Sequence, residues 1–61
     1  MQHFIVRLAL EWFRASGGRT RARLDGLVDH FARNHEFDGV QIARLQGEAW
    51  DAFADTQEAG R

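Results

Sequence analysis

A chain of 61 residues that contains no cysteine must build its fold from packing alone. A domain of this size buries only about 60% of the surface that its unfolded form exposes, and no disulfide or thiolate zinc site can compensate for a thin core. Its hydrophobic content of 44% is ordinary for a globular protein and too high for a disordered one. We therefore expect residues 1–61 to form a single folded domain.

Glycine and polar residues divide the chain into three segments with helical periodicity. Gly17-Gly18 ends the first segment, and the polar stretch 34–39 separates the second from the third. The first has a polar stripe at i, i+4, i+8 and i+11, and the second has an apolar stripe at i, i+3, i+4 and i+7. These patterns predict an all-α protein, arranged as a small bundle or an open helical hairpin. The three predicted helices and a frayed tail span about 2–15, 20–34, 39–56 and 57–61.

The start of the third helix carries the clearest local signal. Asp38 is placed to cap the first turn, Gln41 can cap it in return, and Phe37 can pack on Ile42 as a hydrophobic staple. In the second helix, Gly26 costs roughly 1 kcal/mol against Ala, which favours a close approach to another helix there.

The aromatic content exceeds what three short helices are expected to cover. The first helix is apolar over much more than half of its circumference, whereas a surface helix normally shows a narrower stripe. We therefore expect an oligomer, most simply a two-fold dimer built on the first helix, or docking on another protein. Because Trp and Arg dominate interface energetics, the predicted partner-binding residues centre on these types. They are Trp12, Phe13, Trp50, Phe53, Arg19, Arg21 and Arg23.

Charge is unevenly distributed along the chain. Residues 1–35 carry six arginines and three acidic side chains, whereas residues 36–61 carry two arginines and six acidic side chains. Such a split can bring two copies together head to tail, or the two halves can neutralise each other inside one fold. The net charge of -1 gives no overall attraction to nucleic acid.

Nucleic-acid binding is the alternative function. Arg14, Arg19, Arg21 and Arg23 form a basic cluster near the start of the second helix, where they could contact phosphates. Asp25 follows the cluster at once and weakens this interpretation.

A second possible nucleic-acid signal lies at 40–54. The pattern Ile42-Ala43-x3-Gly47-x5-Phe53 resembles part of a helix-turn-helix over about a dozen residues, which implies a turn at Gly47 followed by a recognition helix. That helix would carry three acidic side chains toward a groove lined with phosphates.

The sequence predicts neither a catalytic site nor a metal or cofactor site. The hydroxyl residues Ser16, Thr20 and Thr56 all lie at predicted helix boundaries, where capping or a turn explains them. His30 and His35 are five residues apart, which is the wrong spacing for zinc binding on one helical face. We expect a non-enzymatic regulator, inhibitor or accessory subunit, and by analogy a chain this short would suit a phage or mobile-element protein.

No segment resembles a membrane span or a secretory signal. The longest apolar stretch, residues 4–13, is interrupted by Arg7 and Glu11 and is far shorter than the roughly 20 residues that a span needs. We expect a cytoplasmic protein. A third interpretation places the first helix flat on a membrane surface, with Trp12 and Phe13 inserted.

Overall fold

The computed structural model describes the backbone of residues 3–59 and the side chains of residues 3–55, and every regular element in this part of the chain is an α-helix. The helices are α1 (Phe4–Ala15), α2 (Arg21–Arg33) and α3 (Gly39–Ala59). This confirms the predicted all-α fold with three helices. α3 continues to Ala59, past the predicted end near Thr56, and residues 60–61 of the predicted frayed tail lie outside the described residues.

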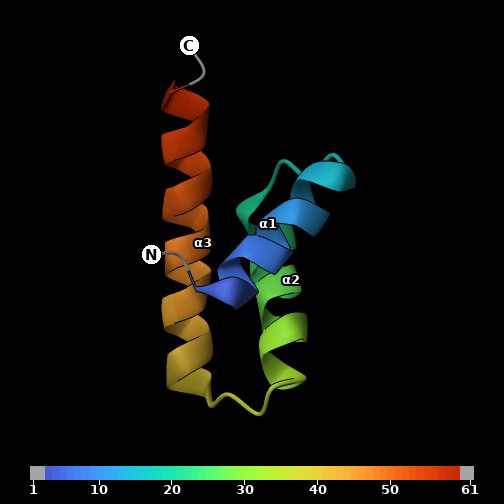
Figure 1. The fold of residues 1–61 in the computed structure, drawn as a ribbon, viewed down its shortest axis with the longest axis vertical. Coiled ribbons are helices and arrows are strands. Elements are labelled where there is room, and N and C mark those ends of the chain that lie inside the picture. The colour runs from blue at the N-terminus through green and yellow to red at the C-terminus, as the bar shows by residue number, and fades with distance from the viewer. Residues whose placement is uncertain (1–2, 60–61) are drawn as a thin grey trace.

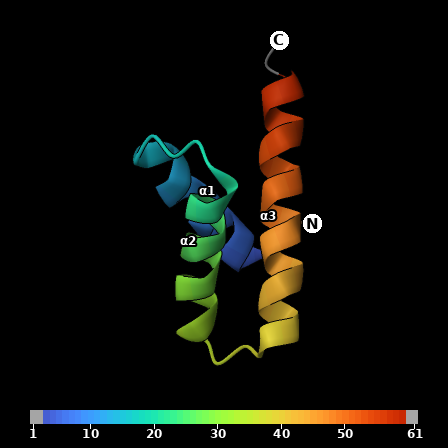
Figure 2. The ribbon, with the colours of Figure 1, turned by 180° about the vertical axis from the view of Figure 1, so that it is seen from behind.

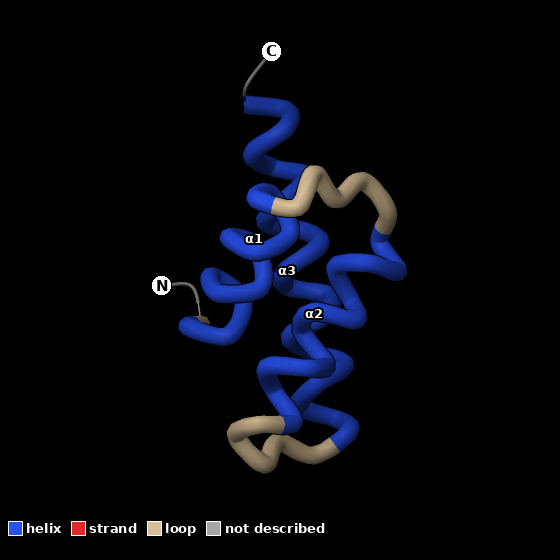
Figure 3. Tube along the Cα trace, turned by 90° about the vertical axis from the view of Figure 1, so that its right-hand side faces the viewer, coloured by secondary structure: helices blue, strands red, loops and turns tan. Residues whose placement is uncertain are grey.

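The three helices form a compact bundle. α2 and α3 run antiparallel as a hairpin, and α1 lies across it (Figures 1 and 2). Each helix packs against both of the others. Residues 34–38 close the hairpin at one end, and residues 16–20 connect α1 to α2 nearer the other end, where α3 extends past them (Figure 3). The principal extents are 37 × 23 × 17 Å.

The core lies where the three helices meet. Buried side chains from all three helices form it: Ile5, Val6, Ala9, Leu10, Phe13, Leu24, Val28, Ala32, Ile42, Leu45 and Ala49. Partly buried side chains pack around it: Leu27, Phe31, Phe37, Trp50, Ala52 and Phe53. Of the seven Phe and Trp side chains, Phe4 and Trp12 are left exposed. Three helices therefore leave Phe4 and Trp12 exposed but bury Phe13 fully and cover the other four aromatic side chains in part, because α1 crosses the hairpin and packs on two helices at once.

A Schellman turn ends α1 at the predicted Gly-Gly stop. The Gly18 N–H donates to the Phe13 carbonyl at 2.8 Å, and the Gly17 N–H donates to the Arg14 carbonyl at 3.1 Å. Gly17 has a φ of 68°, a conformation that favours glycine. Gly18 lies directly against the Phe13 ring, so that a Cβ at this position would overlap the ring. The pair both stops the helix and covers Phe13.

We expect Gly18→Ala to lower the free energy of unfolding by about 1–3 kcal/mol, because the new methyl group overlaps a fully buried ring. Gly26→Ala is the matched control. The predicted close approach at Gly26 is absent, since this residue is exposed and a Cβ there meets nothing within 4 Å. Gly26→Ala should therefore raise the free energy of unfolding by about 1 kcal/mol. Urea denaturation followed by circular dichroism measures the free energy of unfolding of both variants. If both substitutions changed it in the same direction, the close contact between Gly18 and the Phe13 ring would be contradicted.

A second Schellman turn ends α2. The Phe37 N–H donates to the Ala32 carbonyl at 3.3 Å, and the Glu36 N–H donates to the Arg33 carbonyl at 3.1 Å. Glu36 occupies the left-handed position of this turn with a φ of 61°. Glycine is usual there, because a Cβ costs energy in the left-handed region.

Replacing Glu36 by Gly should raise the free energy of unfolding by about 1 kcal/mol, because it removes this left-handed strain. Asn34→Gly is a control in the same turn. Asn34 has a φ of -65°, which any residue adopts, so glycine there relieves no strain and only raises the conformational entropy of the unfolded chain. It should lower the free energy of unfolding. Thermal melts of the two variants check the prediction, which fails if Glu36→Gly is the less stable of the pair.

Side chains cap the start of each helix. The predicted capping box of α3 is confirmed, because Asp38 Oδ1 accepts from the Gln41 N–H at 2.8 Å and Gln41 Oε1 accepts from the Asp38 N–H at 3.1 Å. Thr20 caps α2 through its hydroxyl oxygen. His3 caps α1 by accepting the Ile5 N–H at Nδ1, at 3.1 Å. These caps fix the residue at which each helix begins.

Candidate docking face

The outer side of α1 exposes an apolar row. Phe4, Leu8 and Trp12 follow one another at intervals of four residues, which places them along one side of the helix. Phe4 is 52% exposed, Trp12 is 58% exposed, and Leu8 is half-buried. Arg7 and Glu11 are exposed beside the row. We call these five residues the outer face of α1.

This row stays uncovered because α1 has more apolar circumference than its contact with α2 and α3 can bury. Ile5, Ala9 and Phe13 occupy the inner side and are fully buried. The row lies on the remaining apolar arc. Val40 on α3 is also exposed, but it stands alone, and single exposed apolar residues are normal on protein surfaces.

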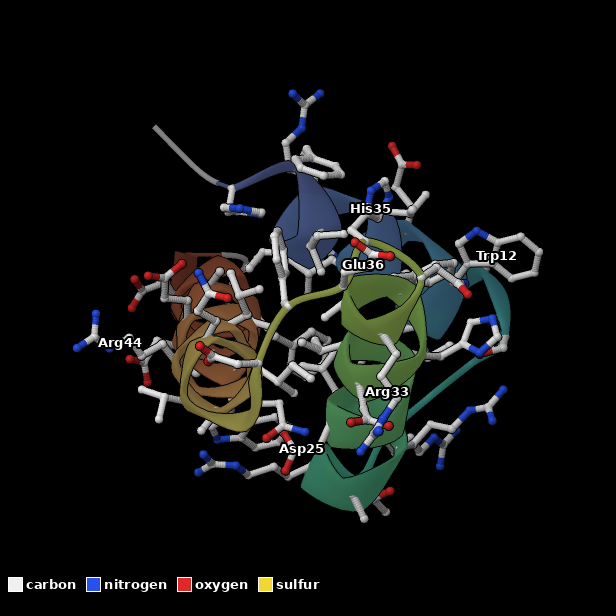
Figure 4. All side chains as sticks on the ribbon, turned by 90° about the horizontal axis from the view of Figure 1, so that it is seen from below. Trp12, Asp25, Arg33, His35, Glu36 and Arg44 are labelled. Atoms are coloured by element: carbon white, nitrogen blue, oxygen red, sulfur yellow. The ribbon has the colours of Figure 1, made fainter. Side chains whose placement is uncertain are left out.

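Aromatic rings from α2 and the turn after it widen the outer face. The Trp12 and Phe31 rings lie 6.2 Å apart, and the His35 ring meets Phe4 edge-on at 5.1 Å, both distances measured between centroids. Figure 4 shows Trp12 projecting from the side of the molecule opposite α3 and Arg44. The exposed apolar surface thus extends from the start of α1 to its last turns.

Two shallow hollows lie along the outer face. Phe4, Arg7, Leu8 and Glu11 line the first, and Glu11 with Trp12 and Ala15 lines the second. Phe4 and Leu8 were absent from the predicted site residues. Their spacing of four from Trp12 was the signal that could have found them, because it places all three on one side of a helix.

The structure separates the predicted aromatic anchors. Phe13 belongs to the core and meets the Phe53 ring edge-on at 5.0 Å, and the half-buried Trp50 ring lies 5.7 Å from Phe53. The expectation that Phe13 lies on an exposed docking surface beside Trp12 is therefore wrong for the single chain. Trp12 lies about 100° around the helix from Phe13, at the edge of the inner side, and is 58% exposed.

The predicted basic residues gather around the connection between α1 and α2. Arg19, Arg21 and Arg23 are all exposed. Arg21 lies 3.8 Å from an Asp25 carboxylate oxygen, and its guanidinium carbon lies 6.0 Å from the Trp50 ring centroid. Arg21 therefore has an opposite charge and an aromatic ring beside it, whereas no such contact engages Arg19 or Arg23 among the described residues.

The helix-turn-helix hypothesis for residues 40–54 is wrong, because α3 runs without a turn through Gly47. The neighbouring Leu45 and Ala49 are buried in the core, and this burial outweighs the cost of about 1 kcal/mol that glycine imposes on a helix. Gln46 also anchors α3, since its side-chain amide donates to the Asp25 carbonyl at 3.1 Å.

Elsewhere on the surface, the ionisable groups form ordinary contacts. Arg33 donates from Nε to both Asp29 carboxylate oxygens at 2.8–2.9 Å, and this hydrogen bonding, together with the opposite charge, raises the pKa of Arg33. Exposed pairs of this spacing are common on helices and contribute little to stability.

Among the described residues, no group of three or more potential ligands is placed to hold a metal ion. The helices in the described part of the chain are also too short or too polar to cross a membrane.

Comparisons with protein-family models, curated proteins and solved structures found no match to this chain. The fold and the face define a small three-helix protein with an exposed aromatic helix face.

The two adjacent aromatic residues of α1, Trp12 and Phe13, should lose very different amounts of stability on truncation to alanine. Phe13→Ala empties the centre of the core and should cost about 3–5 kcal/mol, enough to unfold a domain of this size. Trp12→Ala removes a side chain that is 58% exposed and should cost less than about 1 kcal/mol. Circular dichroism melts at low micromolar concentration distinguish the two. Loss of the folded state in Trp12→Ala would show that Trp12 belongs to the core.

Proposed function

We propose that this chain is a small, non-enzymatic protein-protein interaction module, a regulator, inhibitor or accessory subunit of the cytoplasm, that docks through the outer face of α1. The observation that carries the proposal is the exposure of Trp12 and Phe4 on a helix whose opposite side is fixed in the core. A cluster of exposed aromatic side chains on a small domain is typical of an interface.

The composition of the face suits a protein partner. Trp12 offers a large apolar area with few rotatable bonds, so its ordering on binding costs little entropy, and tryptophan is frequent among residues that dominate binding energy. Arg7 and Glu11 supply a polar rim of mixed charge beside the apolar row. The hydrogen-bonded caps at both ends of α1 hold the row in place before binding, which lowers the cost of association.

Nucleic-acid binding remains the second candidate, on the observation that Arg19 and Arg23 are exposed next to the start of α2. Binding to the phosphate backbone of a nucleic acid needs several free positive charges on the protein. The logarithm of the affinity falls with the logarithm of the salt concentration, more steeply when more phosphates are neutralised. Here Arg21 is engaged by Asp25 and Trp50, which reduces the basic surface. This candidate is therefore the weaker of the two.

A capture experiment tests the proposal. The chain is immobilised through its C-terminus and exposed to an extract of the cells that produce it, beside a Trp12→Glu variant and a Val40→Glu control, which places the same charge on another exposed apolar residue. We expect Trp12→Glu to weaken retention of specific proteins by about thirtyfold or more, as for an interface hot spot, and Val40→Glu to leave it unchanged.

An Arg19/Arg21/Arg23→Ala variant distinguishes nucleic-acid binding from protein docking. Capture that survives Trp12→Glu, but is lost in the triple variant and after nuclease treatment, would replace the proposal with nucleic-acid binding. Equal capture by all four chains would contradict both.

A further inference from the structure

Two opposite charges on the outer face of α1 have no ion-pair partner within the described part of the chain. Arg7 and Glu11 are both exposed, whereas the ion pairs found among residues 3–55 lie on α2. The two charges stand one helical turn apart, beside the row of Phe4, Leu8 and Trp12. An occupant of this face must therefore cover an apolar row and offer opposite charges in the matching order.

A second copy of this chain meets both requirements. We propose that two α1 helices pack antiparallel across their outer faces, around a two-fold axis near Leu8. The inference rests on the proposed function and names the partner of the same face. A two-fold contact uses one surface patch twice, so the patch must be complementary to itself.

The order of charges is self-complementary in the antiparallel arrangement. When one helix is turned end for end about the position of Ala9, midway between the two charges, Arg7 lies beside Glu11 of the second copy, and Glu11 lies beside the second copy's Arg7. A parallel two-fold pair would place the charged edges of the two copies on opposite sides of the contact, where Arg7 and Glu11 would not meet each other. Antiparallel pairing also sets the two helix dipoles in opposite directions.

The apolar row is complementary to itself about an axis at Leu8, one residue or about 1.5 Å along the helix from the axis that pairs the charges. Phe4 and Trp12 lie four residues on either side of Leu8, or about 6 Å along the helix at 1.5 Å per residue. Turning the helix around Leu8 therefore places Trp12 of each copy over Phe4 of the other. The hollow lined by Phe4, Arg7 and Leu8 then faces an indole, and the hollow beside Trp12 and Ala15 faces a phenyl ring.

The size of the face implies a weak dimer. A helix of 12 residues is about 18 Å long, and two such helices in contact bury less than the roughly 800 Å² per partner of a standard interface. We therefore expect a dissociation constant on the order of 10–100 µM. The monomer and the dimer should both be populated within an accessible range of concentrations.

Sedimentation equilibrium of the full chain, from about 5 µM to about 1 mM, tests the inference. Arg7→Glu makes both charges of the face negative, and Glu11→Arg makes both positive. Each variant should self-associate about tenfold more weakly than the wild type, because two attractive pairs become repulsive. An equimolar mixture of the two restores both pairs and should dimerise as the wild type does. Circular dichroism of each variant confirms that it is folded.

Three results would overturn the inference. The first is a wild-type chain that stays monomeric to about 1 mM. The second is a mixture that associates no better than the separate variants. The third is dimerisation that Trp12→Ala leaves unchanged, which would locate the dimer on another surface.

Failure of this inference is distinguishable from failure of the proposed function. A monomeric chain whose capture of another protein still depends on Trp12 removes the second copy as occupant and keeps the docking face. A monomeric chain that instead binds vesicles containing anionic lipid through Trp12 overturns the inference in favour of a membrane surface.

Discussion

Burial of the Phe13 ring is the contact on which the rest of the bundle depends. The ring is fully buried, meets Phe53 of α3 edge-on, and is covered on another side by Gly18 in the connection to α2. The Gly18 N–H also donates to the Phe13 carbonyl, so the same residue ends α1 and closes the core above it. Because the chain has no disulfide, its stability depends on packing contacts such as those of Phe13 with Gly18 and Phe53, which join α1, the connection and α3.

The inward position of Phe13 determines what α1 presents to solvent. Because the helix turns by about 100° per residue, fixing Phe13 at the centre of the inner side directs Trp12 toward the edge and Phe4 toward the outside. The apolar surplus that the sequence carries in this helix is therefore gathered on one narrow face, not spread over the molecule. Stability draws on the inner side of this helix, and the proposed docking would use the outer side.

The helices and their caps could be predicted from the sequence because they depend on neighbours close in the chain. The Asp38 and Gln41 capping box is an example, since both partners lie within one turn. The choice between Trp12 and Phe13 could not be predicted, because both are apolar and the crossing of α1 over the hairpin decides which is buried. The predicted turn at Gly47 was wrong for a similar reason. Glycine favours a turn locally, whereas the burial of neighbouring residues on α3 keeps the helix continuous.

Nuclear Overhauser effects in an isotope-labelled sample at low concentration test the central claim most directly. The account predicts contacts from the Phe13 ring protons to the Gly18 α protons and to the Phe53 ring, and none from the Trp12 indole to Phe53. Contacts between the Trp12 indole and Phe53, with a Phe13 ring that touches neither Gly18 nor α3, would show that α1 is rotated and that its outer face is not the one described.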